Sequence, residues 1–193
     1  MSDYLRRLPI GQRVSTAPLT EDDLWPFDQD LQTVPLDEPL IPEPPQAGGG
    51  GAECRSCEPS PALDAWRDDR WVVRIPPTPS GLPTTAILVS RAHHDLETLP
   101  PDLASELGPM IQRVARAIAQ LPDVGRVHVN RWGDGSEHFH VWFLPRPRGM
   151  WQLRGALLAA WADLLPPVPQ PEWDRNRAAV IAGMLAGGGE AQG

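Results

Sequence analysis

Two histidines alternate with large apolar residues in the segment 137–144, directly after the glycine-containing turn Gly133–Gly135. In an extended strand the side-chain period is two, so His138, His140 and Trp142 should share one face, and the residues between them should point into a core. Two imidazoles in an apolar strand cost free energy unless they are used. The pair is therefore a candidate functional site, although a buried pair satisfied by backbone carbonyls fits the pattern equally well.

The chain has two cysteines, Cys54 and Cys57, in a C-x2-C spacing. Such a pair can exchange disulfides, form half of a zinc site or do neither. Because it follows a glycine-rich linker rather than a strand, the zinc interpretation is favoured over the redox one. Histidines that could complete the site are His93, His94, His128 and His138. One histidine at each of two strand ends, His93 and His138, could close a tetrahedral Cys2His2 site; the alternative is two unused cysteines in an entry loop.

Composition excludes several classes of partner. The net charge of −8 and the pI of about 5.0 argue against nucleic-acid binding through phosphate neutralisation. No apolar run reaches the 18 or more residues of a membrane span, and the first 14 residues lack the apolar centre of a secretory signal. We expect a cytoplasmic protein with neither a nucleic-acid nor a membrane partner.

The chain should have three parts. Residues 1–50 are rich in Pro, Asp and Glu and end in glycines, which predicts an extended, partly disordered arm that lays Trp25 and Phe27 on the domain surface. Residues 51–185 should form the folded domain, and residues 186–193 a tail.

Within the folded domain the apolar patterns predict an α+β fold. Strands are expected at 70–75, 84–89, 126–130 and 138–144, and together they should form an antiparallel sheet. A helix over 101–121 should pack on this sheet, and further helices are expected within 154–165 and 172–185.

The order of these motifs resembles the histidine-triad (HIT) superfamily, which includes nucleotide hydrolases and galactose-1-phosphate uridylyltransferases. The resemblance covers about residues 54–151. It includes the C-x2-C pair, an apolar strand leading to Arg91-Ala92-His93, a Leu-Pro-Pro helix start, Val127-His128-Val129-Asn130, the glycine turn and the His-x-His strand. Pro147–Trp151 is similar to the Trp-containing segment that follows the motif in purine-nucleotide hydrolases. The resemblance implies a HIT-like fold.

The resemblance also implies roles for individual residues. Cys54, Cys57, His93 and His138 match the ligands of a structural zinc, with His94 in reserve if the register is off by one. His140 matches the nucleophile. The candidate substrate-binding residues are Asn130, Gly133, Gly135, Ser136, Trp142 and Trp151. Trp132 could join the tryptophans that stack a base, and Arg146 and Arg148 could add charge for phosphates.

Trp142 departs from the family pattern, because it stands where the third histidine of the triad is expected. That histidine donates to the α-phosphate and the leaving group, whereas uridylyltransferases have glutamine there. An indole has one N–H donor, no acceptor and no titration near neutral pH, so it cannot shuttle a proton. Glu137 and Asp134 are nearby carboxylates that could supply acid–base chemistry, or could simply be solvated.

The sequence therefore supports three hypotheses. The first is a HIT-like nucleotidyl hydrolase or transferase that acts on a nucleoside phosphate ester or phosphoramidate through a nucleotidyl-histidine at His140, with a structural zinc. The second is a degenerate HIT-fold zinc protein that binds a nucleotide or a partner without catalysis. The third is an interaction protein that docks through its acidic arm. The resemblance implies a nucleotide or nucleotide sugar as the small-molecule partner, and it leaves a homodimer open.

Overall fold

A computed structural model describes residues 9–13, 15, 32–35, 37–51 and 53–192. The chain divides into two compact units, 1–45 and 46–193. In the first unit, the side chain of Val34 is largely exposed. Trp25 and Phe27, which were predicted to lie on the domain surface, fall outside the described residues. The second unit contains the sheet, its helices and the candidate site.

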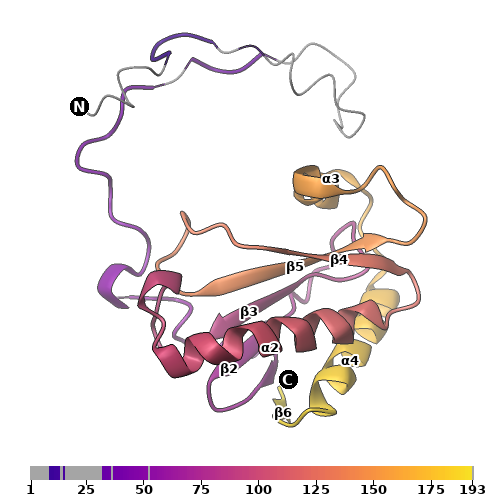
Figure 1. The fold of residues 1–193 in the computed structure, drawn as a ribbon. Coiled ribbons are helices and arrows are strands. Elements are labelled where there is room, and N and C mark those ends of the chain that lie inside the picture. The colour runs from indigo at the N-terminus through magenta and orange to yellow at the C-terminus, as the bar shows by residue number, and fades with distance from the viewer. Residues whose placement is uncertain (1–8, 14, 16–31, 36, 52, 193) are drawn as a thin grey trace. The chain divides into compact units, whose positions relative to one another are not determined.

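A six-stranded sheet forms the centre of the second unit (Figure 1). The strand order is β4-β5-β3-β2-β1-β6, and every neighbouring pair is antiparallel. The strands are β1 (Asp64–Arg67), β2 (Trp71–Arg74), β3 (Ala86–Ser90), β4 (Val124–Asn130), β5 (His140–Pro147) and β6 (Glu190–Ala191). This confirms the predicted α+β architecture with an antiparallel sheet. β1 and β6 were not predicted, because neither is long enough to show a clear alternation of apolar and polar residues.

Strand β5 begins at His140, two residues later than the sequence predicted. His138 lies in a bend before the strand. The backbone N–H of Phe139 donates to the His94 carbonyl at 2.6 Å, and His138 Nε2 lies 2.7 Å from the Ser90 carbonyl. The strand ladder therefore begins only at His140, although Phe139 still points into the core.

Helices α2 (Pro101–Ala119) and α4 (Gln170–Leu185) cover one face of the sheet (Figure 1). Both begin with proline in the first turn, where the missing N–H costs no helical hydrogen bond. They bury the side chains of Leu103, Met110, Val114 and Ile118 from α2 and of Trp173, Val180 and Met184 from α4 against the core-facing residues of the strands. Phe139, Val141 and Phe143 belong to this core, as predicted.

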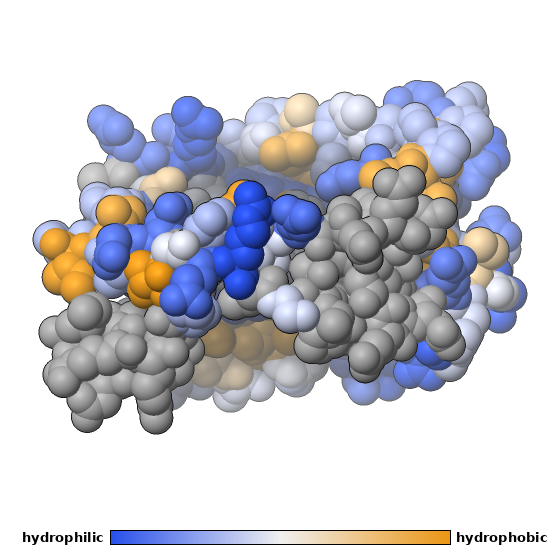
Figure 2. Space-filling view, turned by 90° about the horizontal axis from the view of Figure 1, so that it is seen from above, coloured by the Kyte–Doolittle hydropathy of each residue, from blue (hydrophilic) through white to orange (hydrophobic). Residues whose placement is uncertain are grey.

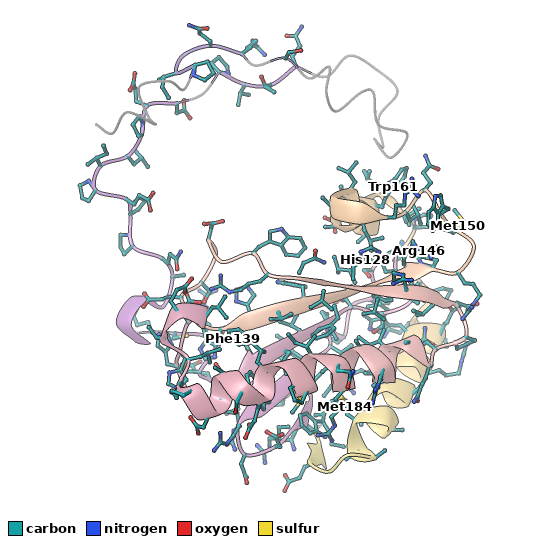
Figure 3. The ribbon with its side chains drawn as sticks, viewed as in Figure 1. His128, Phe139, Arg146, Met150, Trp161 and Met184 are labelled. Carbon is teal, nitrogen blue, oxygen red and sulfur yellow. The ribbon has the colours of Figure 1, made fainter. Side chains whose placement is uncertain are left out.

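The short helix α3 (Leu158–Leu164), preceded by a 3-10 turn at Gly155–Leu157, lies over the opposite face. Leu158 and Ala162 of α3 pack with Leu144 of β5 and Leu82 in a second, smaller core. Gly81 permits this approach, because a Cβ there would come within 2.5 Å of the Leu165 side chain. In Figure 3, Trp161 lies on the same side of the sheet as His128, whereas Met184 lies on the other side.

None of the helices in the described part of the chain is both long and apolar enough to cross a membrane. On the face that Figure 2 shows, hydrophobic residues form separate patches among hydrophilic ones.

Candidate functional site

Four potential metal ligands converge beside the start of β5. Cys54, Cys57, His93 and His138 each place one ligand atom within 4.8 Å of the others. Cys54 Sγ lies 3.4 Å and Cys57 Sγ 3.5 Å from His138 Nδ1, and Cys57 Sγ lies 3.5 Å from His93 Nδ1. With Zn–S of about 2.3 Å and Zn–N of about 2.0–2.1 Å, a tetrahedral site requires S···N separations of about 3.5 Å. The spacing of the four residues therefore fits a tetrahedral S2N2 metal site.

The environment of His138 prepares its ring for a metal. The side chain is fully buried. Its Nε2 must donate to the Ser90 carbonyl at 2.7 Å, because a carbonyl only accepts, and this leaves the Nδ1 lone pair directed at the two cysteines. Burial also lowers the pKa of His138, against a smaller opposing effect of the Ser90 carbonyl, and so favours the neutral ring that a metal requires.

The histidine of the first loop that reaches the cluster is His93. His94 contributes its backbone carbonyl to Phe139 instead. His128 lies on β4, paired with Leu144, and is not in the cluster. Burial lowers the pKa of His128, and the charges of Arg146 and Arg126 lower it further. The predicted choice of His93 and His138 over the other two candidates therefore agrees with their placement.

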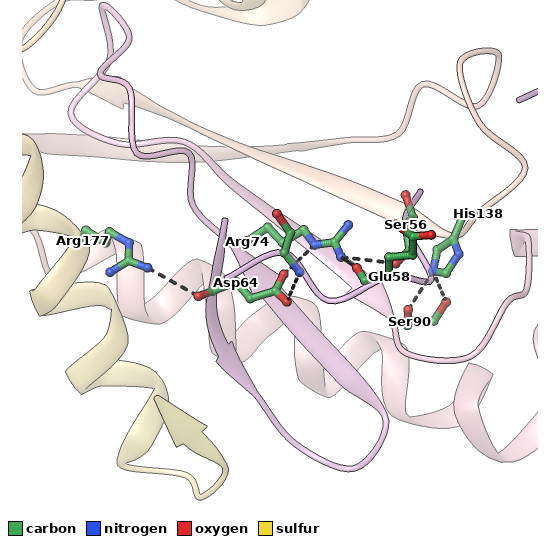
Figure 4. A network of polar contacts seen from close by, with 8 residues as sticks. Ser56, Glu58, Asp64, Arg74, Ser90, His138 and Arg177 are labelled. Atoms are coloured by element: carbon green, nitrogen blue, oxygen red, sulfur yellow. Dashed lines mark hydrogen bonds and ion pairs between the residues drawn. The ribbon is translucent and has the colours of Figure 1, made fainter. Parts of the chain in front are cut away.

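A buried ion pair holds the cysteine loop in place (Figure 4). Arg74 of β2 donates through Nε to Asp64 at 2.8 Å, and both side chains are nearly buried. The same guanidinium donates through Nη2 to the carbonyls of Ser56, at 3.2 Å, and Glu58, at 3.0 Å. Because these carbonyls flank Cys57, the ion pair fixes the backbone that presents the cysteine sulfurs.

Arg74→Met should therefore weaken both folding and metal binding. The change leaves Asp64 buried without its partner and removes the donor to two carbonyls, so we expect a loss of about 3 kcal/mol in the free energy of unfolding. Metal affinity should fall by roughly 10- to 100-fold, which is the usual effect of removing a residue that holds metal ligands in place. Urea unfolding and titration against a competing chelator measure the two effects.

Arg70→Met is the matched control, because Arg70 forms exposed ion pairs with Asp102 and Glu106. It should cost less than about 1 kcal/mol and leave metal affinity unchanged. Equal effects of the two substitutions would show that Arg74 does not support the cysteine loop.

His140, the predicted nucleophile, stands at the start of β5 with one ring nitrogen held by the backbone. Its Nδ1 lies 2.7 Å from the carbonyl of His138, and it must be the donor in that hydrogen bond. The free nitrogen of the ring is consequently Nε2, with its lone pair unused. This tautomer is the one a nucleophilic histidine needs.

The ring of His140 lines a cavity of about 480 Å³ between β5, the β4–β5 loop and α3. Trp142 lines the same cavity and meets Trp132 edge to face, with ring centroids 6.4 Å apart. The cavity lies within the size range of small-molecule sites and combines aromatic walls with few polar groups. Its walls also include Ser80, Thr85, Gly135, Leu144, Ala159, Ala162 and Asp163.

The other predicted substrate-binding residues do not line this cavity. Asn130 pairs with Trp142 across the β4–β5 ladder. Gly133 lies in the β4–β5 loop, and Ser136 lines a neighbouring cavity. Trp151 is 67% exposed, and the guanidinium carbons of Arg154 and Arg146 lie 4.3 Å and 5.6 Å from its ring centroid. Their roles in binding remain predictions.

Arg146, Arg148 and Glu137 have structural partners instead of lining the cavity of His140. Arg146 donates to the carbonyls of Pro147 and Met150, and Arg148 donates to those of Pro122 and Val124. Figure 3 shows Arg146 beside Met150, near the end of β5. Glu137 accepts a hydrogen bond from the backbone N–H of Gly50 at 3.3 Å.

Sequence reasoning missed the contribution of α3 to the cavity. Asp163 is the one carboxylate among the described residues that line it. Ser80 and Thr85 come from the segment between β2 and β3. The pattern of residues 154–165 predicts a helix, but it does not indicate that this helix lines the cavity. The position of α3 depends on its close packing against Gly81, which is distant in sequence.

This fold is similar to that of solved proteins. The chain superposes on a histidine triad protein from Bradyrhizobium japonicum with a TM-score of 0.52 and 17% identity, covering 63% of this chain and 90% of that chain. The chain has the histidine-triad fold. A histidine triad protein from Sinorhizobium meliloti gives a TM-score of 0.50 and 15% identity, covering 63% and 88% of the two chains. No family model and no curated protein matches the sequence. The likeness that these comparisons show therefore concerns the fold.

Proposed function

We propose that this protein is a HIT-like nucleotidyl hydrolase or transferase that works through a nucleotidyl-histidine at His140, and that Cys54, Cys57, His93 and His138 hold a structural zinc. One observation carries the proposal: the His140 ring lines a cavity of about 480 Å³, with Nδ1 committed to a carbonyl and Nε2 free. A neutral imidazole in this tautomer presents a lone pair at Nε2 that can act as a nucleophile.

The proposed reaction has two displacements at one phosphorus. In the first, the Nε2 lone pair of His140 forms an N–P bond, and the bond from phosphorus to the leaving group breaks with its electron pair on the leaving group. In the second, water or a hydroxyl acceptor forms a bond to phosphorus and releases its proton to solvent, and the N–P electron pair returns to His140. Trp132 and Trp142 would hold the base, since aromatic faces stack on nucleobases.

The proposed zinc supports this chemistry from outside the cavity. Two sulfur and two nitrogen ligands would fill a tetrahedral ion completely, so it would have no open position for a substrate. His138 would be fixed by the metal, and its carbonyl in turn holds Nδ1 of His140. Metal binding would therefore orient the nucleophile through two residues of the backbone.

A second candidate function is a zinc-containing nucleotide binder without catalysis, which Trp142 favours because an indole cannot exchange a proton with the substrate. Incubation of the zinc-loaded protein with a nucleoside phosphoramidate, a dinucleoside polyphosphate and a UDP-sugar, followed by intact-mass spectrometry, separates the two. A nucleotidyl adduct that maps to His140 supports the enzyme. Binding without an adduct supports the binder.

Trp142→His should raise the hydrolysis of a nucleoside phosphoramidate. The new imidazole could protonate the departing amine, and general acid catalysis typically contributes about 100- to 10,000-fold where the group is well placed. Steady-state turnover of the phosphoramidate measures the effect. Trp142→Gln, which supplies a donor but no titratable proton, is the matched control and should give a smaller gain. If both variants turn over the phosphoramidate at the wild-type rate, the lack of a proton donor at position 142 does not limit the reaction.

A further inference from the structure

Four arginines gather at the far end of β5 and on the strand beside it. Arg146 lies on β5, Arg148 and Arg154 follow it in the chain, and Arg126 lies on β4 directly opposite Arg146. At a rise of about 3.3 Å per residue, Arg146 is roughly 20 Å along the strand from His140. These arginines are therefore separate from the candidate active site.

The charges of these arginines are not neutralised by carboxylates. Within the part of the chain that the structure describes, none of the four forms an ion pair. Arg146 and Arg148 donate to backbone carbonyls, which fix their positions and leave their charges in place. Asp123 is an exposed neighbour whose carbonyl accepts from the backbone N–H of Arg148, but its carboxylate pairs with none of them.

Two of the arginines face each other across the sheet. Like charges at directly opposite positions of an antiparallel ladder are destabilising, and Arg126 and Arg146 are such a pair. Burial lowers the pKa of the neighbouring His128, and the two arginine charges lower it further. Figure 3 shows His128 and Arg146 on the same side of the sheet. A protein of net charge −8 thus concentrates positive charge at one place, where an anionic partner would compensate it.

Exposed apolar side chains lie among these charges. Trp151 is 67% exposed and Met150 is 48% exposed. The Arg154 guanidinium carbon lies 4.3 Å from the centroid of the Trp151 ring, so the charge and the indole form one continuous surface. Large apolar side chains surrounded by charged ones mark interaction sites, and tryptophan and arginine are the residues that most often carry the binding energy of interfaces.

We propose that Trp151, Met150 and the arginines around them form a docking surface for an acidic peptide segment of a partner protein. In this segment carboxylates flank an apolar side chain: the carboxylates pair with Arg126 and Arg154, and the apolar side chain covers Trp151. A short segment interacts mainly with charges within about 8–10 Å, so the negative charge elsewhere on the protein does not prevent its binding. The surface does not depend on the proposed function of His140.

The surface is tested with the zinc-loaded full chain and a fluorescein-labelled peptide of sequence Glu-Glu-Phe-Glu-Glu-Phe-Glu-Glu, by fluorescence anisotropy. Binding should be saturable and should weaken as salt is added. Trp151→Ala should weaken it roughly tenfold, and Trp151→Phe should retain part of it. Arg126→Ala and Arg154→Ala should each weaken it about threefold to fivefold. Arg126→Ala should not lower the melting temperature, because it removes a like-charge pair.

Matched controls identify where and how the peptide binds. Arg175→Ala removes the same charge from an exposed position on α4, and Trp132→Ala removes an exposed tryptophan from the His140 cavity. Neither should change the affinity. A labelled peptide with glutamine in place of every glutamate should bind much more weakly, and single-stranded oligodeoxythymidylate should bind more weakly than the acidic peptide.

The inference is overturned if the acidic peptide does not bind saturably, if the glutamine peptide binds equally well, or if Trp151→Ala and Arg154→Ala bind as wild type does. Equal weakening by Arg175→Ala would show a general charge effect, and equal weakening by Trp132→Ala would place the peptide in the His140 cavity instead. Tighter binding of the oligonucleotide would assign the surface to nucleic acid and would also overturn the inference.

Discussion

His140→Ala should abolish nucleotidyl transfer while zinc content and thermal stability stay close to those of wild type. Removal of a covalent nucleophile lowers turnover on the order of a million-fold, because no other group takes over the attack. The ring occupies the edge of a cavity and makes its one described hydrogen bond to the His138 carbonyl, so its loss should disturb the fold little. Turnover, intact mass and zinc content of the variant are the measurements.

His128→Gln is the control for this experiment, because His128 is a second histidine of the same sheet that does not line the cavity. It should retain turnover and form the adduct as wild type does. If His140→Ala still accumulates a nucleotidyl adduct, the nucleophile lies elsewhere. If it loses zinc as well as activity, His140 has a structural role that the hydrogen-bond geometry does not indicate.

Cys54→Ser should release the metal and lower the melting temperature by roughly 10–20 °C. Structural zinc contributes its binding free energy to folding, and a loss of about 5 kcal/mol in a domain of this size corresponds to such a shift. Cys54 is the buried cysteine of the pair, so its substitution also removes one of the two sulfur ligands from the buried side of the cluster. Metal analysis of the purified protein and thermal unfolding with and without a chelator measure the effect.

Ser56→Ala is the matched control in the same loop. Arg74 contacts the Ser56 backbone carbonyl rather than its hydroxyl, so this variant should keep zinc and melt within a few degrees of wild type. A chelator should lower the melting temperature of wild type and of Ser56→Ala but not that of Cys54→Ser. Purified wild type that contains no zinc and is insensitive to chelators would contradict the metal assignment.

The sequence was sufficient to predict the elements that have a strong period. The helix over 101–121 and the strand over 84–89 appear as α2 and β3 with small shifts at their ends. The candidate metal cluster could be predicted because its two residue types are rare in this chain, which has two cysteines and five histidines. The prediction of His138 within a strand was wrong, because hydrogen bonds to residues 90 and 94 bend the backbone there. Contacts between residues so far apart in sequence cannot be predicted from the local pattern of apolar residues.

The cavity itself could not be predicted from sequence. One wall comes from α3, whose position depends on the missing Cβ of Gly81 and on the small core around Leu144. Arg146 follows the motif strand as a phosphate-binding residue could, but its charge is used by carbonyls of its own turn.

The separation of the metal ligands along the chain has a consequence for how the domain folds. Cys57 and His93 are 36 residues apart, and Cys54 and His138 are 84 residues apart. Closing loops of this length costs chain entropy, and this cost rises slowly with loop length. The binding free energy of an ion that bridges the loop ends would offset part of this cost. If these four residues bind zinc as proposed, an ion held by the two cysteines during refolding would act as a tether for each incoming histidine. The concentration of free zinc should then influence not only the stability of the native state but also the rate at which the sheet is assembled.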